Sequence, residues 1–97
     1  MATYIALSRF TDQGIRSIKD TTKRADAAKE AAKKFGANMT HIFWTLGHYD
    51  LVTIIEASDE QAVTALMLSI SSAGNIRTET LRAFDQEEMG GILAKVP

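Results

Sequence analysis

The side chains best suited to acid–base or hydrogen-bonding chemistry lie in one stretch of this chain. Tyr49 and Asp50 end the segment Gly47-His48-Tyr49-Asp50, and His41 precedes it. A tyrosine beside an aspartate supplies a donor and an acceptor, which can orient a polar substrate or hold a proton. The same residues also suit a turn, because glycine accepts a positive φ and aspartate binds nearby amides. We favour the structural role; the functional one requires a cleft beside the turn.

The two histidines do not predict a metal site within one chain. His41 and His48 are separated by an odd number of positions, which places them on opposite faces of a straight strand. Metal sites need several ligands in a fixed geometry, so only a site shared between subunits stays open. The chain has no cysteine, and hence no disulfide, thiolate nucleophile or zinc–thiolate site. It also lacks a phosphate-binding or dinucleotide-binding glycine motif. We expect no metal and no cofactor.

A further polar set lies near the C-terminus. Thr78, Thr80 and Arg82 alternate with other residues, so they share one face of a strand. Buried hydroxyl and guanidinium groups need partners, and arginine favours a carboxylate or a phosphate. We therefore predict a small-ligand cleft with apolar walls and few polar groups. Its predicted residues are Tyr4, Phe43, Thr80 and Arg82, with Tyr49 and Asp50 at the rim and His41 as a further candidate.

The elements that must position these residues follow from periodicity. We predict a strand over 3–10, a helical face over 15–35 that loosens near 21–22, strands over 39–46 and 51–57, a helix over 59–73 and a strand over 76–84. We expect one short helical turn after residue 85, before Gly90-Gly91. This order predicts an α+β, ferredoxin-like βαββαβ fold. Right-handed crossovers place the first and third strands centrally in a four-stranded antiparallel sheet, with both helices on one face.

The second sheet face is too apolar to face water. The second strand carries Ile42, Trp44 and Leu46 on one face and Met39, His41 and Phe43 on the other. A sheet with one wet face alternates more cleanly. We therefore expect homo-oligomerisation, with two sheets packed face to face. The alternative is that the C-terminal tail folds over this face. Trp44 is expected to pack under a helix.

Composition limits the class of protein and its partners. A length of 97 residues fits one domain, 1–97, with a core over about 3–84 and a tail over 85–97. The hydrophobic fraction of 45% is typical of a globular chain, and the net charge of −1 gives no pull toward nucleic acid or an anionic membrane. Acidic residues interrupt the basic run over 16–34, so we interpret it as a solvated helix face. No targeting or membrane-spanning segment is visible, and we expect a cytoplasmic protein.

Several segments, taken together, resemble the GYD-domain family. The segment Thr45-Leu46-Gly47-His48-Tyr49-Asp50-Leu51-Val52 is similar to the turn after which that family is named. Further similar positions are Phe10-Thr11, Gly14-Ile15, Lys19, Arg24, Gly74-Asn75-Ile76-Arg77-Thr78, Thr80-Leu81 and Ala83-Phe84. The resemblance runs from about Tyr4 to Phe84. It implies a small oligomeric protein similar to the dimeric α+β barrels, and it implies no settled activity.

Three functions fit these observations. The leading hypothesis is a homo-oligomer that binds a small ligand, anionic if an arginine holds it, at a sheet or subunit interface. The second is a cofactor-free isomerase or monooxygenase, which needs a base in the cleft, and His41, Tyr49 and Asp50 are the candidates. The third is a purely structural assembly module. A shared fold does not choose among them.

Overall fold

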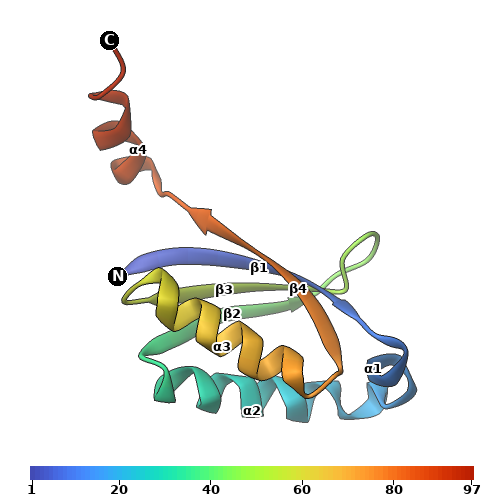
Figure 1. The fold of residues 1–97 in the computed structure, drawn as a ribbon. Coiled ribbons are helices and arrows are strands. Elements are labelled where there is room, and N and C mark those ends of the chain that lie inside the picture. Colours follow the sequence, from blue (N-terminus) through green and yellow to red (C-terminus); the bar gives the residue numbers. More distant parts are fainter.

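The computed structural model describes residues 1–97 (Figure 1). In chain order the elements are β1 (Ala2–Phe10), α1 (Asp12–Arg16), the 3-10 helix η1 (Ile18–Asp20), α2 (Thr21–Lys34), β2 (Ala37–Trp44), β3 (Leu51–Ala57), α3 (Glu60–Ser72), β4 (Ile76–Ala83) and α4 (Gln86–Leu93). All strand pairs are antiparallel, in the order β2-β3-β1-β4. Helices α2 and α3 lie on one face of the sheet (Figure 1). The predicted α+β, ferredoxin-like fold is confirmed.

The core lies between the sheet and these two helices. Strand pairing places Tyr4, Ile55 and Arg82 side by side on the helix-covered face. Ile55 and Leu66 are fully buried, and Tyr4 is 4% exposed. The opposite face, here called the open face, carries Ile5, Leu7, Phe43, Val52, Ile54 and Leu81. Apolar residues on both faces match the sequence pattern.

One residue of β2 lies on the face opposite to the one predicted. The pairing of β2 with β3 shifts between Met39 and His41, leaving Thr40 as an extra residue. Such a bulge reverses the alternation of side chains beyond it. Met39, 9% exposed, therefore lies on the helix-covered face with Ile42 and not with His41.

The first helical stretch, predicted as one amphipathic face that loosens near 21–22, is broken just before residue 21. Thr11 caps α1 by accepting a hydrogen bond from the Gly14 amide at 3.1 Å. The chain then passes through η1 before α2 begins at Thr21. The break changes the helical phase, so Ile15 and Ile18 are 53% and 38% exposed although both were expected to face inward.

Hydrogen bonds join two chain junctions at one end of the sheet. The Thr11 amide donates to the carbonyl oxygen of Asn75 at 3.0 Å, and the Thr11 hydroxyl donates to that of Gly74 at 2.6 Å. The same Asn75 oxygen would lie only 2.1 Å from a Cβ built on Gly14. The β1–α1 and α3–β4 junctions therefore touch through bare backbone, which requires glycine at position 14.

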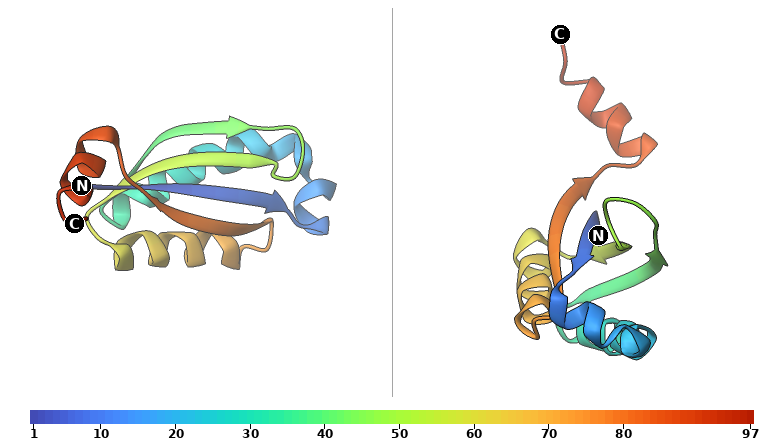
Figure 2. Two further views of the ribbon diagram at one scale, coloured as in Figure 1. Left: turned by 90° about the horizontal axis from the view of Figure 1, so that it is seen from above. Right: turned by 90° about the vertical axis from the view of Figure 1, so that its right-hand side faces the viewer.

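The C-terminal segment is a longer helix than predicted. Helix α4 runs through Gly90 and Gly91, and an Asp85–Glu88 capping box fixes its start. Glu88 also accepts from Arg82 at 3.0 Å, which lowers the pKa of its carboxyl group and keeps it ionised. Helix α4 projects away from the sheet on the side opposite α2 and α3, so it does not fold over the open face (Figures 1 and 2).

No helix is both long enough and apolar enough to span a membrane.

Candidate functional site

The loop between β2 and β3 ties the central hairpin to β1. Gly47 has φ +97°, a region that side chains with a Cβ avoid. The Asp50 carboxylate accepts from the Phe10 amide at 2.9 Å, and the Asp50 amide donates to the Ser8 carbonyl at 2.9 Å. Asp50 was expected to bind amides of its own turn. It binds a strand 40 positions away instead, so it fixes the end of β1.

Tyr49 makes its side-chain contacts on the open face. Its hydroxyl donates to the Glu79 carboxylate of β4 at 2.9 Å, while the Arg9 guanidinium lies 5.2 Å from its ring centroid. The hydrogen bond to Glu79 raises the pKa of Tyr49, with a smaller contribution from the negative charge of Glu79. Tyr49 therefore remains protonated at neutral pH, where it serves as a donor and not as a base.

Both histidines are exposed and lie at separate places. The His41 ring stacks on Phe43 on the open face, with centroids 5.7 Å apart. His48 lies in the loop, where it contacts Arg9. No group of three or more histidine or carboxylate side chains lies close enough together to hold a metal ion.

The structure does not bring the predicted ligand residues into one cleft. Tyr4, Thr80 and Arg82 lie on the helix-covered face, whereas His41 and Phe43 lie on the open face. Arg82 is already occupied within the chain. It pairs with Glu88 and packs 4.4 Å from the ring centroid of Phe84.

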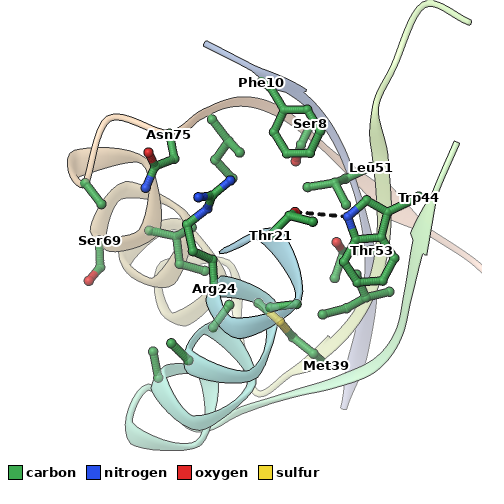
Figure 3. A pocket seen from close by; sticks show the side chains of 18 residues that line it. Ser8, Phe10, Thr21, Arg24, Met39, Trp44, Leu51, Thr53, Ser69 and Asn75 are labelled. Atoms are coloured by element: carbon green, nitrogen blue, oxygen red, sulfur yellow. Dashed lines mark hydrogen bonds between the residues drawn. The ribbon is translucent and has the colours of Figure 1, made fainter. Parts of the chain in front are cut away.

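An apolar cavity lies instead between α2, α3 and the helix-covered face of the sheet (Figure 3). Its volume is about 280 Å³, and 12 of its 18 lining residues are hydrophobic. This is near the lower limit of about 300 Å³ for small-molecule pockets. Apolar wall residues include Phe10, Met39, Ile42, Trp44, Leu51 and Ile70. We call this space the helix–sheet pocket.

Polar groups sit at opposite sides of the helix–sheet pocket. On one side the Trp44 indole N–H donates to the Thr21 hydroxyl at 3.0 Å (Figure 3). On the other, Arg24 extends from α2 near Asn75. His41, Tyr49 and Asp50 do not line the pocket, so the three proposed bases are absent from it.

Sequence reasoning missed this pocket because its signal resembled ordinary core packing. Ala25, Ala28 and Ala31 of α2 line the pocket, and Ser8 and Thr53 are small lining residues of the sheet. Small residues facing small residues leave space that larger side chains would fill. The run of alanines was the available clue.

Comparison with known proteins places the chain among relatives. The family model described as GYD domain matches residues 4–93. The chain is 34% identical over 84 residues to the Thermus thermophilus "Glutamine synthetase and cystathionine beta-lyase binding protein", covering 86% of this chain and 88% of that one.

Two solved structures are also similar. A crystal structure of a Thermus thermophilus protein matches with a TM-score of 0.57 and 26% identity over 88% of this chain and 95% of that one. The feast or famine regulatory protein of M. tuberculosis, solved with L-methionine, matches with a TM-score of 0.67 at 14% identity, over 89% of this chain and 52% of that one. The second match concerns the fold alone.

The glycine, tyrosine and aspartate at 47, 49 and 50 and the family match over nearly the whole chain agree, and this chain belongs to the GYD-domain family.

Proposed function

We propose that this protein is a homo-oligomeric binding protein in which two copies pack their open faces together. The observation that carries the proposal is the exposed apolar surface that extends across that face from β2 to β4. Phe43 is 51% exposed and Leu81 is 43% exposed, and Ile5, Leu7 and Ile54 are only partly covered. Continuous apolar surface of this kind is typical of protein interfaces.

The charges on the open face favour a second copy as the occupant. Arg9 and Arg77 pair at one end of the sheet, near the 45–50 loop. Glu56 lies at the other end, opposite Thr3 and beside the strand end that leads to α4. A two-fold axis through the face would set the basic end of each copy against the acidic end of the other.

The two projections beside the open face fit the same arrangement. The 45–50 loop and α4 both extend on the side opposite α2 and α3 (Figure 1). Leu46 at the loop, Leu93 in α4 and Val96 after it are 101%, 59% and 62% exposed. In a face-to-face dimer these side chains would gain contacts with the second copy, since nothing in their own chain covers them.

A charge-swap series tests the paired ends. Glu56→Arg and Arg77→Glu should each raise the dimer dissociation constant about tenfold or more, because like charges would meet twice across a two-fold interface. The double variant should recover most of the loss. Sedimentation equilibrium measures all three. A wild-type mass of 10.6 kDa would rule out self-association. A double variant whose loss of dimer affinity equals the sum of the two single losses would rule out this arrangement.

We also propose that the oligomer binds partner enzymes. The support is the Thermus thermophilus relative, which is named for binding glutamine synthetase and cystathionine β-lyase. Immobilised protein should retain either purified enzyme in a binding assay, and serum albumin serves as the control. Retention of neither enzyme at micromolar concentration would contradict this part of the proposal. A cytoplasmic location is consistent with such partners and belongs to the same proposal.

We propose that the small ligand binds in the helix–sheet pocket. The residues first considered for a ligand cleft are divided between two faces, whereas this pocket combines apolar walls with a few polar groups. Since it is separated from the open face by the sheet, ligand binding and self-association can be tested independently.

A further inference from the structure

We propose that the helix–sheet pocket binds a small monocarboxylate with an apolar body, and that Arg24 holds the carboxylate. This inference rests on the proposed small-ligand role of the pocket and names the chemical class of the ligand. Four observations carry it: the open volume, the apolar walls, the isolated charge of Arg24 and the hydrogen-bonding donors that Arg24 has free.

The volume of the pocket follows from the small size of several residues that line it. Along α2 the inward side chains are Ala25, Ala28 and Ala31, and Ser8 and Thr53 of the sheet lie across from them. Ser69, Ile70 and Ala73 of α3 complete the lining, and about 280 Å³ stays open. An unfilled apolar cavity costs stability. A ligand with an apolar body would recover the missing contacts.

Arg24 gives the pocket its charge. It is the only ionisable residue in the lining, and no aspartate or glutamate faces it. The two ion pairs of the chain join Lys33 to Glu30 and Arg82 to Glu88, so Arg24 has no carboxylate partner. A partly buried guanidinium with neutral neighbours favours an anion.

Three hydrogen bonds position the guanidinium and leave room for a ligand. One terminal nitrogen donates to the Ser17 carbonyl at 2.8 Å and to the Ser17 hydroxyl at 3.1 Å, and the other donates to the Gly14 carbonyl at 3.3 Å. An arginine has five N–H donors. The two that remain suffice for one carboxylate.

The charge count and the volume together define the ligand class. A phosphate dianion would need a second cation, and none of the lysines of α2 lines the pocket. A volume near the lower limit for ligand pockets excludes a nucleotide. The remaining class is a monocarboxylate whose apolar body reaches toward Met39 and Trp44.

Trp44 makes the test direct because it is the only tryptophan and it lines the pocket. The probes are straight-chain carboxylates from butyrate to octanoate, together with phenylacetate, each compared with its neutral amide. Tryptophan emission and the melting temperature are recorded during titration. We expect at least one acid to shift the emission and raise the melting temperature. It should bind about tenfold or more tightly than its amide, because a charge-assisted pair is stronger than a neutral one.

Variants separate the charge from the cavity. Arg24→Gln should abolish the preference for acid over amide, with Arg16→Gln as the control at an exposed arginine nearby. Ala28→Leu should fill the cavity and abolish binding of both probes, with Ala65→Leu on exposed α3 surface as its control. Should Arg24→Gln fail to fold, the acid–amide comparison in the wild-type protein decides the question.

The outcomes distinguish the carboxylate assignment from the proposal that the helix–sheet pocket binds a small ligand. Equal affinity for acid and amide, both abolished by Ala28→Leu, would overturn the carboxylate assignment and keep the pocket as a ligand site. No emission change with any probe would overturn both. Either result leaves self-association through the open face to be judged on its own measurements.

Discussion

Gly14→Ala is expected to lower the free energy of unfolding by about 3 kcal/mol or more, because the backbone atoms that the new methyl group would meet cannot move aside as a flexible side chain can. The new Cβ would lie 2.1 Å from the Asn75 carbonyl oxygen, well inside contact distance. That oxygen cannot withdraw without breaking its 3.0 Å hydrogen bond from the Thr11 amide. Domains of this size are stable by roughly 5–15 kcal/mol, so the loss is large. Urea unfolding monitored by circular dichroism measures it.

The matched control for this change is Gly91→Ala. Gly91 lies within α4, and a Cβ there would meet nothing within 4 Å. Alanine is favoured over glycine in a helix by about 1 kcal/mol, so α4 should gain helicity. A Gly14→Ala protein with wild-type stability would mean that the two junctions do not touch as described.

Phe43→Asp is expected to convert the proposed oligomer to a monomer while the fold survives. Phe43 is 51% exposed in the single chain, so its replacement removes little of the core. In a two-fold dimer both copies carry the substitution at the interface. Losing about 2 kcal/mol at each copy, a modest value for a buried aromatic anchor, would raise the dissociation constant roughly a thousandfold. Sedimentation velocity over a concentration series measures the shift.

Leu68→Asp provides the control for Phe43→Asp. Leu68 is 66% exposed on α3, on the opposite side of the sheet, and the substitution has the same chemistry. It should leave the mass unchanged. A Phe43→Asp variant that sediments like the wild-type protein would show that the open face is not the contact between copies.

The architecture could be predicted from the sequence because it depends on residue patterns that are local in the chain. Runs of β-branched, aromatic and apolar residues indicated the strands, and alternation indicated the last one. Glycines at 36 and 74, both with positive φ, follow the ends of α2 and α3. Thr11 and Asp59, whose side chains are of types common at helix starts, cap α1 and α3. These are local features, so a sequence carries them directly.

Features that depend on contacts distant in sequence were not predicted. The bulge at Thr40 follows from how β2 aligns with β3, and one extra residue moved Met39 to the other face. The partner of Asp50 lies on β1, and that of Tyr49 lies on β4. For the site, the sequence indicated apolar walls and an arginine. The prediction named Arg82, and the sequence did not reveal that this side chain pairs with Glu88.

The strand order also determines when the protein can fold during synthesis. Strand β1 emerges first from the ribosome, yet it lies inside the sheet, between β3 and β4. Tyr4 pairs with Arg82, so the sheet cannot be completed until nearly the whole chain has been made. Before then β1 presents an unpaired edge, a site where nascent chains can associate wrongly. Pairings this far apart in sequence also slow folding. We therefore expect the sheet to form only after β4 has been made, with β1 lacking one neighbour until then.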